Sequence, residues 1–560
     1  MKGKIGCFLF LILIGFGMVP VGSYYDHRFS HEDTKTLHDG AILSEVTFST
    51  YIDGWNDDTI DCIVVDVFNN TYIAGRTRSS DLPSGGHLGF VYSGYNDYYV
   101  MKLNSFREIE YMTYVGADGP EGSPNLTPIG ACSIDVDNLG RVYMTGTTAS
   151  YYFPLVNPWE DEFGGFGDCF ALRLSSTGDT LQYSTFLPGN RLDIGTAIQV
   201  DTSYNAYICG WTQSDDFPTL NAYDSDLSGN SDLFLLKLDS NGQLRFSTYV
   251  GGSGIESTQG TSSLFLDENR NCYIIGSTNS PDLYVSNHDI EYNGPSKDLF
   301  FMMISPFGAF LSGSYYGSPD ADYVGGIWAD DLGDIYLTGS TVGTLPFDYT
   351  IGPNPKAFVA KFTLTGALIH STGFGGSDVN YPLGLFVDDE HCAFVTGYTD
   401  APDFPLEDPI ESTYHGLEDC FVVKLSGDGD RLLFSSYLGG NESDIGFAAA
   451  LTPYNRIMVA GVSNSSDFES INQSIVANHQ LYGFIVEFED IWEDIPLPTS
   501  TVTATTSIIP TPSTTTSLPP NTSPEPDSPL FINSILLTVL AIELIILFSM
   551  VQRIRRNLHA

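Results

Sequence analysis

A short apolar segment that ends in glycine occurs seven times in this chain of 560 residues. The glycines are Gly75, Gly146, Gly210, Gly276, Gly339, Gly397 and Gly461, at a mean spacing of about 64 residues. A repeat of this length is one supersecondary unit, which buries its apolar face only against its neighbours. The recurrence therefore constrains the architecture of the chain more than its chemistry.

Each repeat contains four predicted β-strands. The first is a short apolar strand that usually ends in Asp, as at 63–66, and the second begins with an aromatic residue, as at 72–75. The third begins with Asp and ends in a basic residue and Leu, as at 97–103, and the fourth reads Phe-Ser-Thr-Tyr-Val-Gly-Gly at 246–252. Alternating side-chain character along such runs is typical of strands.

The copy numbers of these strands predict how the array closes. Strands one to three occur seven times, but only six copies of the fourth strand follow them. The seventh copy stands before the first repeat, at 48–54, and the last repeat ends with its third strand at 484–488. An N-terminal strand that completes the last sheet removes the free edges of an open array. We therefore predict an all-β fold, a closed seven-bladed β-propeller, over an open β-solenoid, which would not need that strand.

The repeat motifs resemble those of the seven-bladed β-propeller repeat (SBBP repeat) family of cell-surface proteins. The similar segments read "VD..GN.Y.TG.T", "D.F..KL" and "YSTYLGG" and recur over residues 48–488. In the fifth and seventh repeats Lys356 and Tyr482 replace the Asp of the third strand. The resemblance implies a propeller at the cell surface, and it implies no shared catalytic activity.

The two ends of the chain predict a membrane-anchored protein. Lys2 and Lys4 precede an apolar run, as in a secretory signal peptide. Near the C-terminus, an apolar run long enough to cross a bilayer precedes three arginines, which places the tail in the cytoplasm and the propeller outside, as in a single-pass type I protein of the cell membrane. The Thr/Ser/Pro-rich segment before this run is extended and serves as a stalk. The predicted parts are a signal peptide (1–23), a linker (24–44), the propeller (45–492), the stalk (493–529), a transmembrane helix (530–551) and the tail (552–560).

The charge of the chain limits its partners. Lys and Arg number 23 against 69 Asp and Glu, which gives a formal net charge of −46. Such a surface repels phosphates, so nucleic acid is excluded as a partner. It suits divalent cations, cationic partners or a saline exterior, and composition does not separate these three.

Two residue types report on the predicted extracellular location. Of the eight cysteines, Cys7 lies in the signal peptide, and the other seven form an odd set without shared spacing. They predict isolated buried thiols instead of a disulfide framework. Asn-x-Ser/Thr sequons permit N-glycosylation at Asn69, Asn125, Asn441, Asn464, Asn472 and Asn521.

Loop lengths single out one face of the predicted propeller. The first-to-second and third-to-fourth connections are short, whereas the second-to-third connections run to about 20 residues and one fourth-to-first connection is also long. Both long classes open on one face, which is the predicted binding face. Aromatic side chains beside Asp and Asn suit a glycan or another protein, although each ring could instead fill the core of its own loop. The aromatic candidates are Trp55, Trp159, Trp211, Tyr223, Tyr292 and Tyr414.

Acidic or amide residues also precede the innermost strands. They stand eight positions before the end of the strand, and Ile129 and Gln259 break the pattern in the second and fourth repeats. Around a central channel, such oxygens would ring the mouth and attract a cation. The alternative, which we favour, is that each accepts backbone N–H groups at a joint between blades. These residues are Asp58, Asp193, Asp322, Asn380 and Asp444.

One loop has the spacing of a calcium site. Oxygen-bearing side chains stand at its positions 1, 3, 5 and 9, and Gly229 stands at position 6, where the chain must turn sharply. The loop resembles the calcium loops of integrin-type propellers, with a serine in place of one acidic residue, and calcium is the one cofactor that the sequence suggests. The predicted ligands are Asp224, Asp226, Ser228, Asn230, through its carbonyl, and Asp232.

The sequence contains no catalytic signature in a credible context, neither a nucleophile elbow nor a His-Glu-x-x-His helix nor a phosphate-binding loop. The predicted function is therefore binding: a membrane-anchored extracellular protein that presents a propeller for adhesion or for recognition of a glycan or protein. Propellers also host enzymes. The alternative is a surface-tethered polysaccharide hydrolase or lyase that uses Asp and Glu on the long-loop face.

Overall fold

The computed structural model describes residues 46–489, except 84–91, 93–95, 123–131, 259–261, 286–291, 293, 295 and 469–480. This part contains thirty strands and no helix. The described residues therefore include no helix that could cross a bilayer. The predicted signal peptide, linker, stalk and transmembrane helix lie outside the described residues.

The strands form seven antiparallel sheets, which we number as blades 1 to 7. Two sheets gain a short extra strand, β14 (Glu256–Ser257) in blade 4 and β21 (Tyr349–Ile351), which lies parallel to the outer strand of blade 5. From the inside outward, blade 1 contains β2 (Cys62–Val65), β3 (Thr71–Thr77), β4 (Asp97–Leu103) and β5 (Ile109–Val115). Blade 2 contains β6 (Cys132–Val136), β7 (Val142–Thr148), β8 (Asp168–Leu174) and β9 (Leu181–Leu187). Blade 3 contains β10 (Asp193–Val200), β11 (Ala206–Thr212), β12 (Asp232–Leu238) and β13 (Leu244–Val250). Blade 4 contains β15 (Leu264–Leu266), β16 (Cys272–Thr278), β17 (Asp298–Ile304) and β18 (Phe310–Tyr316), and blade 5 contains β19 (Asp322–Ala329), β20 (Ile335–Thr341), β22 (Ala357–Phe362) and β23 (Leu368–Phe374). Blade 6 contains β24 (Asn380–Val387), β25 (Ala393–Thr399), β26 (Asp419–Leu425) and β27 (Leu432–Leu438). Blade 7 contains β28 (Asp444–Leu451), β29 (Arg456–Ser463), β30 (Tyr482–Glu489) and β1 (Val46–Ile52).

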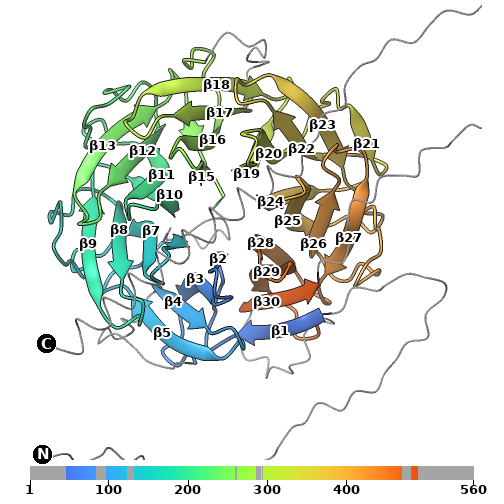
Figure 1. Ribbon diagram of the computed structural model, residues 1–560, viewed down its shortest axis with the longest axis horizontal. Helices are drawn as coiled ribbons and strands as arrows, with labels where there is room; N and C mark the ends of the chain where they lie inside the picture. The colour runs from blue at the N-terminus through green and yellow to red at the C-terminus, as the bar shows by residue number, and fades with distance from the viewer. Residues whose placement is uncertain are drawn as a thin grey trace, which may run out of the picture. The chain divides into compact units, whose positions relative to one another are not determined.

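The N-terminal strand completes the last blade, as predicted. β1 pairs antiparallel with β30, with Val46 opposite Phe488 and Ile52 opposite Gly483. Figure 1 shows the resulting ring of seven sheets, with β1 beside β30. The ring is closed by this strand exchange, while the seven sheets stay separate and are not hydrogen-bonded into one continuous barrel.

Side-chain packing between neighbouring sheets forms the core. In the cluster between blades 7 and 1, Ile52 packs with Met458 and Ile485 of blade 7 and with Ile63 and Met101 of blade 1. The prediction of buried thiols without a disulfide framework is confirmed, because the seven cysteines of the described residues are buried and none forms a disulfide: Cys62, Cys132, Cys169, Cys209, Cys272, Cys392 and Cys420.

The recurrent glycine allows a close approach of the innermost strand. Opposite Gly210, the inner strand β10 contains a bulge between Gly195 and Ala197. A β-carbon at Gly210 would lie 1.9 Å from the carbonyl oxygen of Ile194, which no side chain could tolerate without a backbone shift. The same crowding occurs at Gly75, Gly397 and Gly461. The repeat therefore requires glycine here for steric reasons.

We expect Gly210→Ala to lower the free energy of unfolding by about 2 kcal/mol or more, because a new methyl group would press on rigid backbone. Urea or thermal unfolding of the purified protein measures the loss. Gly276→Ala is the matched control, because its β-carbon would meet the movable side-chain ends of Leu233 and Phe300 instead. Equal losses in the two variants would contradict this explanation.

The Asp that ends most first strands holds the turn that follows. In blade 3, Asp201 accepts N–H bonds from Ser203 (2.8 Å) and Asn205 (3.0 Å), and the hydroxyl of Tyr207 donates to it (3.3 Å). In blade 7, where Thr452 replaces Asp, its hydroxyl accepts the N–H of Arg456 at 3.0 Å. The "VD..GN.Y" motif is therefore a turn motif of the fold.

Candidate functional site: the long-loop face and the joints beneath it

The antiparallel order of strands gives the propeller two unlike faces. The first-to-second and third-to-fourth turns lie on one face, which we call the short-turn face, and the other two connections lie on the long-loop face. β1 begins and β30 ends at the short-turn face, where Val46 lies opposite Phe488. Both ends of the described chain therefore leave from one face, and the long-loop face carries neither.

Most of the six predicted aromatic residues pack against the strands of the blades. Trp159 and Trp211 pack against buried core clusters. The ring of Tyr223 stacks on Phe310, that of Tyr292 packs on Tyr315 and that of Tyr414 on Tyr437, with centroids 5.8 to 5.9 Å apart. Only Trp55 among the six is largely exposed, at 75%. Five of the six therefore pack on core clusters and outer strands of the blades, and not within separate cores of their own loops.

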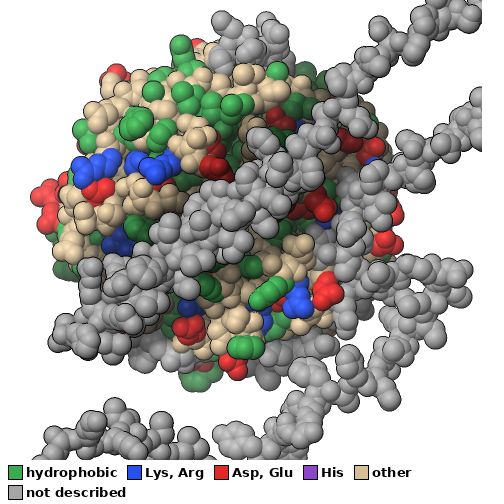
Figure 2. Space-filling view, viewed as in Figure 1, with side chains coloured by type: hydrophobic (Ala, Val, Ile, Leu, Met, Phe, Trp, Pro, Cys, Tyr) green, Lys and Arg blue, Asp and Glu red, His purple; other side chains and the backbone are tan. Residues whose placement is uncertain are grey.

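Three aromatic side chains that the sequence analysis did not single out are exposed on the long-loop face. Tyr151 and Tyr152 are 69% and 71% exposed, and their rings make an edge contact with centroids 5.3 Å apart. Phe166, on the same second-to-third connection, is 85% exposed. Figure 2 shows on one face of the molecule how hydrophobic and acidic side chains are intermingled. Together with Trp55, the residues Tyr151, Tyr152 and Phe166 form what we call the exposed aromatic set.

A departure from the repeat could have revealed Tyr152. Five other blades have Asp at this position, and each Asp accepts the N–H of a residue on the preceding fourth-to-first loop. In blade 3, for example, Asp216 accepts the N–H of Asn190 at 2.8 Å. Tyr152 cannot accept this bond through a carboxylate, so blade 2 gives up a structural contact and gains an exposed ring. The other five residues are Asp81, Asp216, Asp282, Asp403 and Asp467.

The predicted channel-mouth residues lie at the joints between blades. In blade 1, Asp58 accepts the N–H of Gly54 (2.8 Å), which ends the fourth strand of the preceding blade, and O–H bonds from Thr77 and Ser79. All five predicted residues accept the N–H of the residue four positions earlier, and none is more than 1% exposed. These contacts are those of the alternative in which each side chain accepts backbone N–H groups at a joint between blades. The five are Asp58, Asp193, Asp322, Asn380 and Asp444.

Glu121 and Glu256 occupy the equivalent places in blades 2 and 4. Glu256 accepts the N–H of Gly252 (3.0 Å) and the hydroxyl of Ser280 (2.6 Å), and Glu121 accepts the hydroxyl of Ser150 (2.8 Å). Sequence reasoning missed them because it counted a fixed distance from the first strand. The spacing from acid to serine is 21 residues in blades 1, 3 and 7, but 29 and 24 in these two blades.

At five joints, a second buried acid from the third strand of the preceding blade lies close to the first. A β-carbon at Gly439 would lie 3.0 Å from Asp419 Oδ1 and 3.1 Å from Asp444 Oδ2, so the two carboxyls converge on this glycine. Burial raises the pKa of Asp419 to about 8, with repulsion from Asp444 and Glu411 adding to it, and burial raises the pKa of Asp444 to about 6. The pairs are Asp97 with Glu121, Asp168 with Asp193, Asp232 with Glu256, Asp298 with Asp322, and Asp419 with Asp444.

The predicted calcium loop does not gather its acids closely. Asp224 accepts the N–H of Asp226 (3.1 Å), and the buried Asp232 accepts the N–H of Ser228 (3.0 Å), while Asn230 is exposed. The bond to Asp232 is a repeat feature, since the N–H of Gly164 donates to Asp168 in the same way. Calcium binding by this loop stays a prediction.

Among the described residues, two other groups bring three ligand atoms within 4.8 Å, Asp330 with Asp331 and His391, and Asp388 with Glu390 and Cys392. Both lie on first-to-second turns. The Tyr336 hydroxyl donates to Asp330 (3.1 Å), and Lys424 lies 3.3 Å from Asp388. Both aspartates are thus turn-holding acids of the repeat.

The six sequons differ in their surroundings. Asn69 is 5% exposed and accepts a hydrogen bond from Arg107, so the folded chain offers little access there. Asn441 and Asn464 are exposed. Asn125, Asn472 and Asn521 lie outside the described residues, and glycosylation stays a prediction.

No protein-family model matches this sequence, and no curated protein sequence matches it. Solved structures that it resembles include an ulvan lyase of a new polysaccharide lyase family (10% identity, TM-score 0.42, 74% of this chain and 93% of that one). Others are BamB from Moraxella catarrhalis (12%, 0.36, 80% and 100%) and the Pan2 WD40 domain of Neurospora crassa (9%, 0.37, 76% and 88%). These likenesses are too low to bear on function. The fold is a seven-bladed β-propeller on the strength of its strand pairing, and membership of the seven-bladed β-propeller repeat family stays a prediction.

Proposed function

We propose that this chain is a membrane-anchored, extracellular binding protein, whose propeller recognises a glycan or another protein through its long-loop face. The observation that carries the proposal is that both ends of the described chain, Val46 and Glu489, lie at the short-turn face. The stalk and transmembrane helix expected from the sequence would then follow from the short-turn face, and the long-loop face carries no end of the described chain.

The exposed aromatic set supports recognition at this face. An aromatic ring with one open face offers apolar area at low entropic cost, and neighbouring Asp and Asn side chains offer hydrogen bonds. The ring of Tyr152, which contacts that of Tyr151, stands where the repeat otherwise places a structural Asp. A glycan or a protein surface is therefore the ligand class that we propose.

The alternative is a polysaccharide hydrolase or lyase. Acids with raised pKa values are a mark of catalytic sites, but they also arise in buried structural networks. Here the raised pKa values of the joint acids accompany structural hydrogen bonds to amides and hydroxyls. These acids are buried in joints, and this favours binding over turnover.

The test is a glycan array probed with the purified protein, combined with a reducing-sugar release assay on the glycans that bind. We expect binding without turnover. In the double variant Tyr151→Ala/Tyr152→Ala, we expect affinity to fall by about tenfold or more, as for aromatic hot spots. Phe307→Ala is the control, because Phe307 is 83% exposed on a third-to-fourth turn of the opposite face. Turnover that a single Asp→Asn change abolishes would overturn the proposal in favour of the enzyme.

A further inference from the structure

The innermost strands enclose a central cavity of about 370 Å³, within the size range of small-molecule sites. Its lining comes from β2, β6, β10, β15, β19, β24 and β28, so every blade contributes. The lining residues cluster toward the ends of these first strands, near the short-turn face. The cavity is thus separate from the exposed aromatic set.

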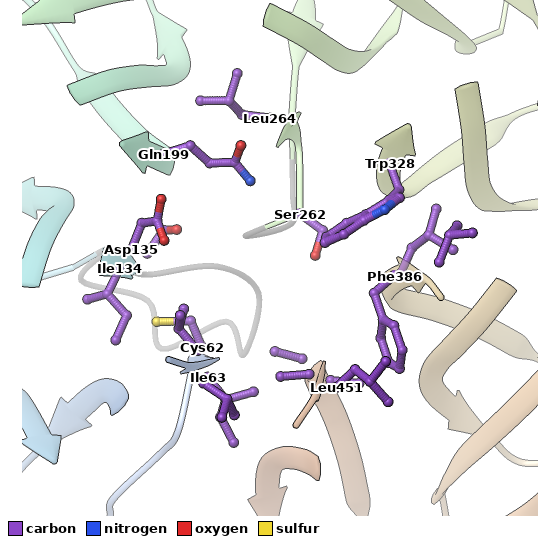
Figure 3. A pocket seen from close by; sticks show the side chains of 18 of the residues that line it. Cys62, Ile63, Ile134, Asp135, Gln199, Ser262, Leu264, Trp328, Phe386 and Leu451 are labelled. Atoms are coloured by element: carbon purple, nitrogen blue, oxygen red, sulfur yellow. The ribbon is translucent and has the colours of Figure 1, made fainter. Parts of the chain in front are cut away.

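One wall of the cavity is polar. Asp135 Oδ1 and Oδ2 accept the N–H groups of Val136 and Val200, each at 2.7 Å, and Gln199 accepts the N–H of Leu266 at 2.7 Å. These bonds hold the two side chains at the cavity and leave the carboxylate with further lone pairs. Figure 3 shows Asp135 and Gln199 on one side, with the amide nitrogen of Gln199 directed inward.

The opposite wall is apolar and aromatic. Trp328 is half-buried and packs on Phe265, with ring centroids 4.8 Å apart, and Phe386 stacks on Phe394 at 4.5 Å. Figure 3 shows Trp328 and Phe386 across the cavity from Asp135. A ligand that fills the cavity therefore meets a carboxylate on one side and aromatic side chains on the other.

The charges of the lining favour a cation. The described lining residues include Asp135, Asp388 and Asp389 and no Lys, Arg or His. Asp388 is paired with Lys424 at 3.3 Å, whereas Asp135 has no basic partner among the described residues. A desolvated carboxylate gains from a cationic hydrogen-bond donor, and aromatic faces also attract cations.

We infer that the central cavity binds an organic cation with an apolar body, an alkyl or aryl ammonium, whose charged head meets Asp135 and whose body packs against Trp328 and Phe386. This site does not rest on the function proposed above, because it lies on a different part of the propeller. It accounts for a carboxylate that is held at the cavity without a basic partner among the described residues, and for the aromatic wall that faces it.

The test is calorimetric titration of the full-length protein at pH 7.5 with three matched probes, 2-phenylethylammonium, 2-phenylethanol and 3-phenylpropanoate. We expect the ammonium to bind about tenfold or more tightly than the carboxylate, with the alcohol between them. Asp135→Asn is expected to remove this preference, because it removes the charge and leaves an amide oxygen that still accepts a backbone N–H. Equal affinities for the three probes, no binding of any probe, or an unchanged preference in Asp135→Asn would each overturn the inference.

Two further variants locate the probe. Trp328→Ala is expected to weaken all three probes by about fivefold or more, because it removes an aromatic wall that they share. Trp328→Phe keeps a ring if the alanine variant does not fold, and in it the change of tryptophan fluorescence on binding should be lost. The matched control is Phe307→Ala, which alters an exposed aromatic side chain outside both the cavity and the exposed aromatic set and should leave every affinity unchanged. Weakening in the control and not in the Trp328 variants would also overturn the inference.

Discussion

A chain that lacks residues 46–52 is expected to lose the folded monomeric propeller. β1 covers the whole free edge of β30, and its Tyr51 and Ile52 are 6% and 3% exposed. Burial of a large apolar side chain contributes about 1.5–3 kcal/mol, and the unpaired edge of β30 adds a further loss. Domains are stable by only about 5–15 kcal/mol, so removal of the strand cancels most of this margin.

Size-exclusion chromatography and thermal unfolding measure this effect. The control restores the strand at the other end of the sequence: residues 46–54 are moved to follow Phe488, through a five-residue turn copied from 239–243. Because Val46 already lies opposite Phe488, a turn of this length joins the two strands as in the other blades. We expect this variant to fold as a monomer within about 2 kcal/mol of the parent. A shortened chain that unfolds at the parent temperature would contradict the closure by β1.

The closure could be predicted because it depends on counting. A fourth strand that is missing after 484–488 and present at 48–54 has one pairing that leaves no edge, and β1 takes it. The extra strand β21 could not be predicted in this way. It pairs in parallel with β23, whereas the same connection in blades 2, 3 and 6 meets the fourth strand through isolated antiparallel bridges, so no repeat pattern announces it.

The candidate sites were less predictable, because exposure depends on packing between loops. Trp159 stands on a long loop like Trp55, and Trp211 lies near the end of β11, yet both pack against core clusters. The acids Glu121 and Glu256 hold their places through hydrogen bonds to hydroxyls, which tolerate loops of different length before the first strand. A position defined by its contact partners is invisible to a search at fixed spacing.

The same joint acids predict an unusual dependence of stability on pH. Burial raises the pKa values of eight of them to between about 6 and about 8: Asp58, Glu121, Asp168, Asp193, Asp232, Asp322, Asp419 and Asp444. In the unfolded chain, such groups titrate near pH 4. Between about pH 4 and pH 8, the folded state therefore binds more protons than the unfolded state, so stability falls as pH rises.

We expect the free energy of unfolding to fall by at least about 4 kcal/mol between pH 5 and pH 8.5. Even about 0.5 kcal/mol from each of eight acids gives this loss, and one full pKa unit represents about 1.4 kcal/mol. Urea unfolding at fixed ionic strength, with a chelator present, measures the slope. A stability that rises over this range would show that the joint acids are ionised at no cost in the folded protein.

Asp419→Asn isolates one pair. Asp419 Oδ1 is buried without a hydrogen-bond partner in the described part of the chain, and it faces Asp444 and Glu411. An amide removes the charge and can donate to a neighbouring carboxylate, so the variant should gain about 1–3 kcal/mol at pH 8.5 and little at pH 5.

The chain contains its own precedent for this exchange. At the joint between blades 5 and 6, Asn380 replaces the acid that accepts the loop N–H at the other joints. Lys356 replaces the second acid, which comes from the third strand of the preceding blade. The Asn380 side chain donates to the carbonyl oxygens of Asp378 (2.7 Å) and Gly376 (3.2 Å), so this joint is satisfied without a buried charge. Asn380→Asp is therefore the reverse control, and it should steepen the loss of stability with rising pH. If both variants leave the slope unchanged, the pH dependence arises outside the joints, and the paired acids are ordinary ionised acceptors of hydrogen bonds.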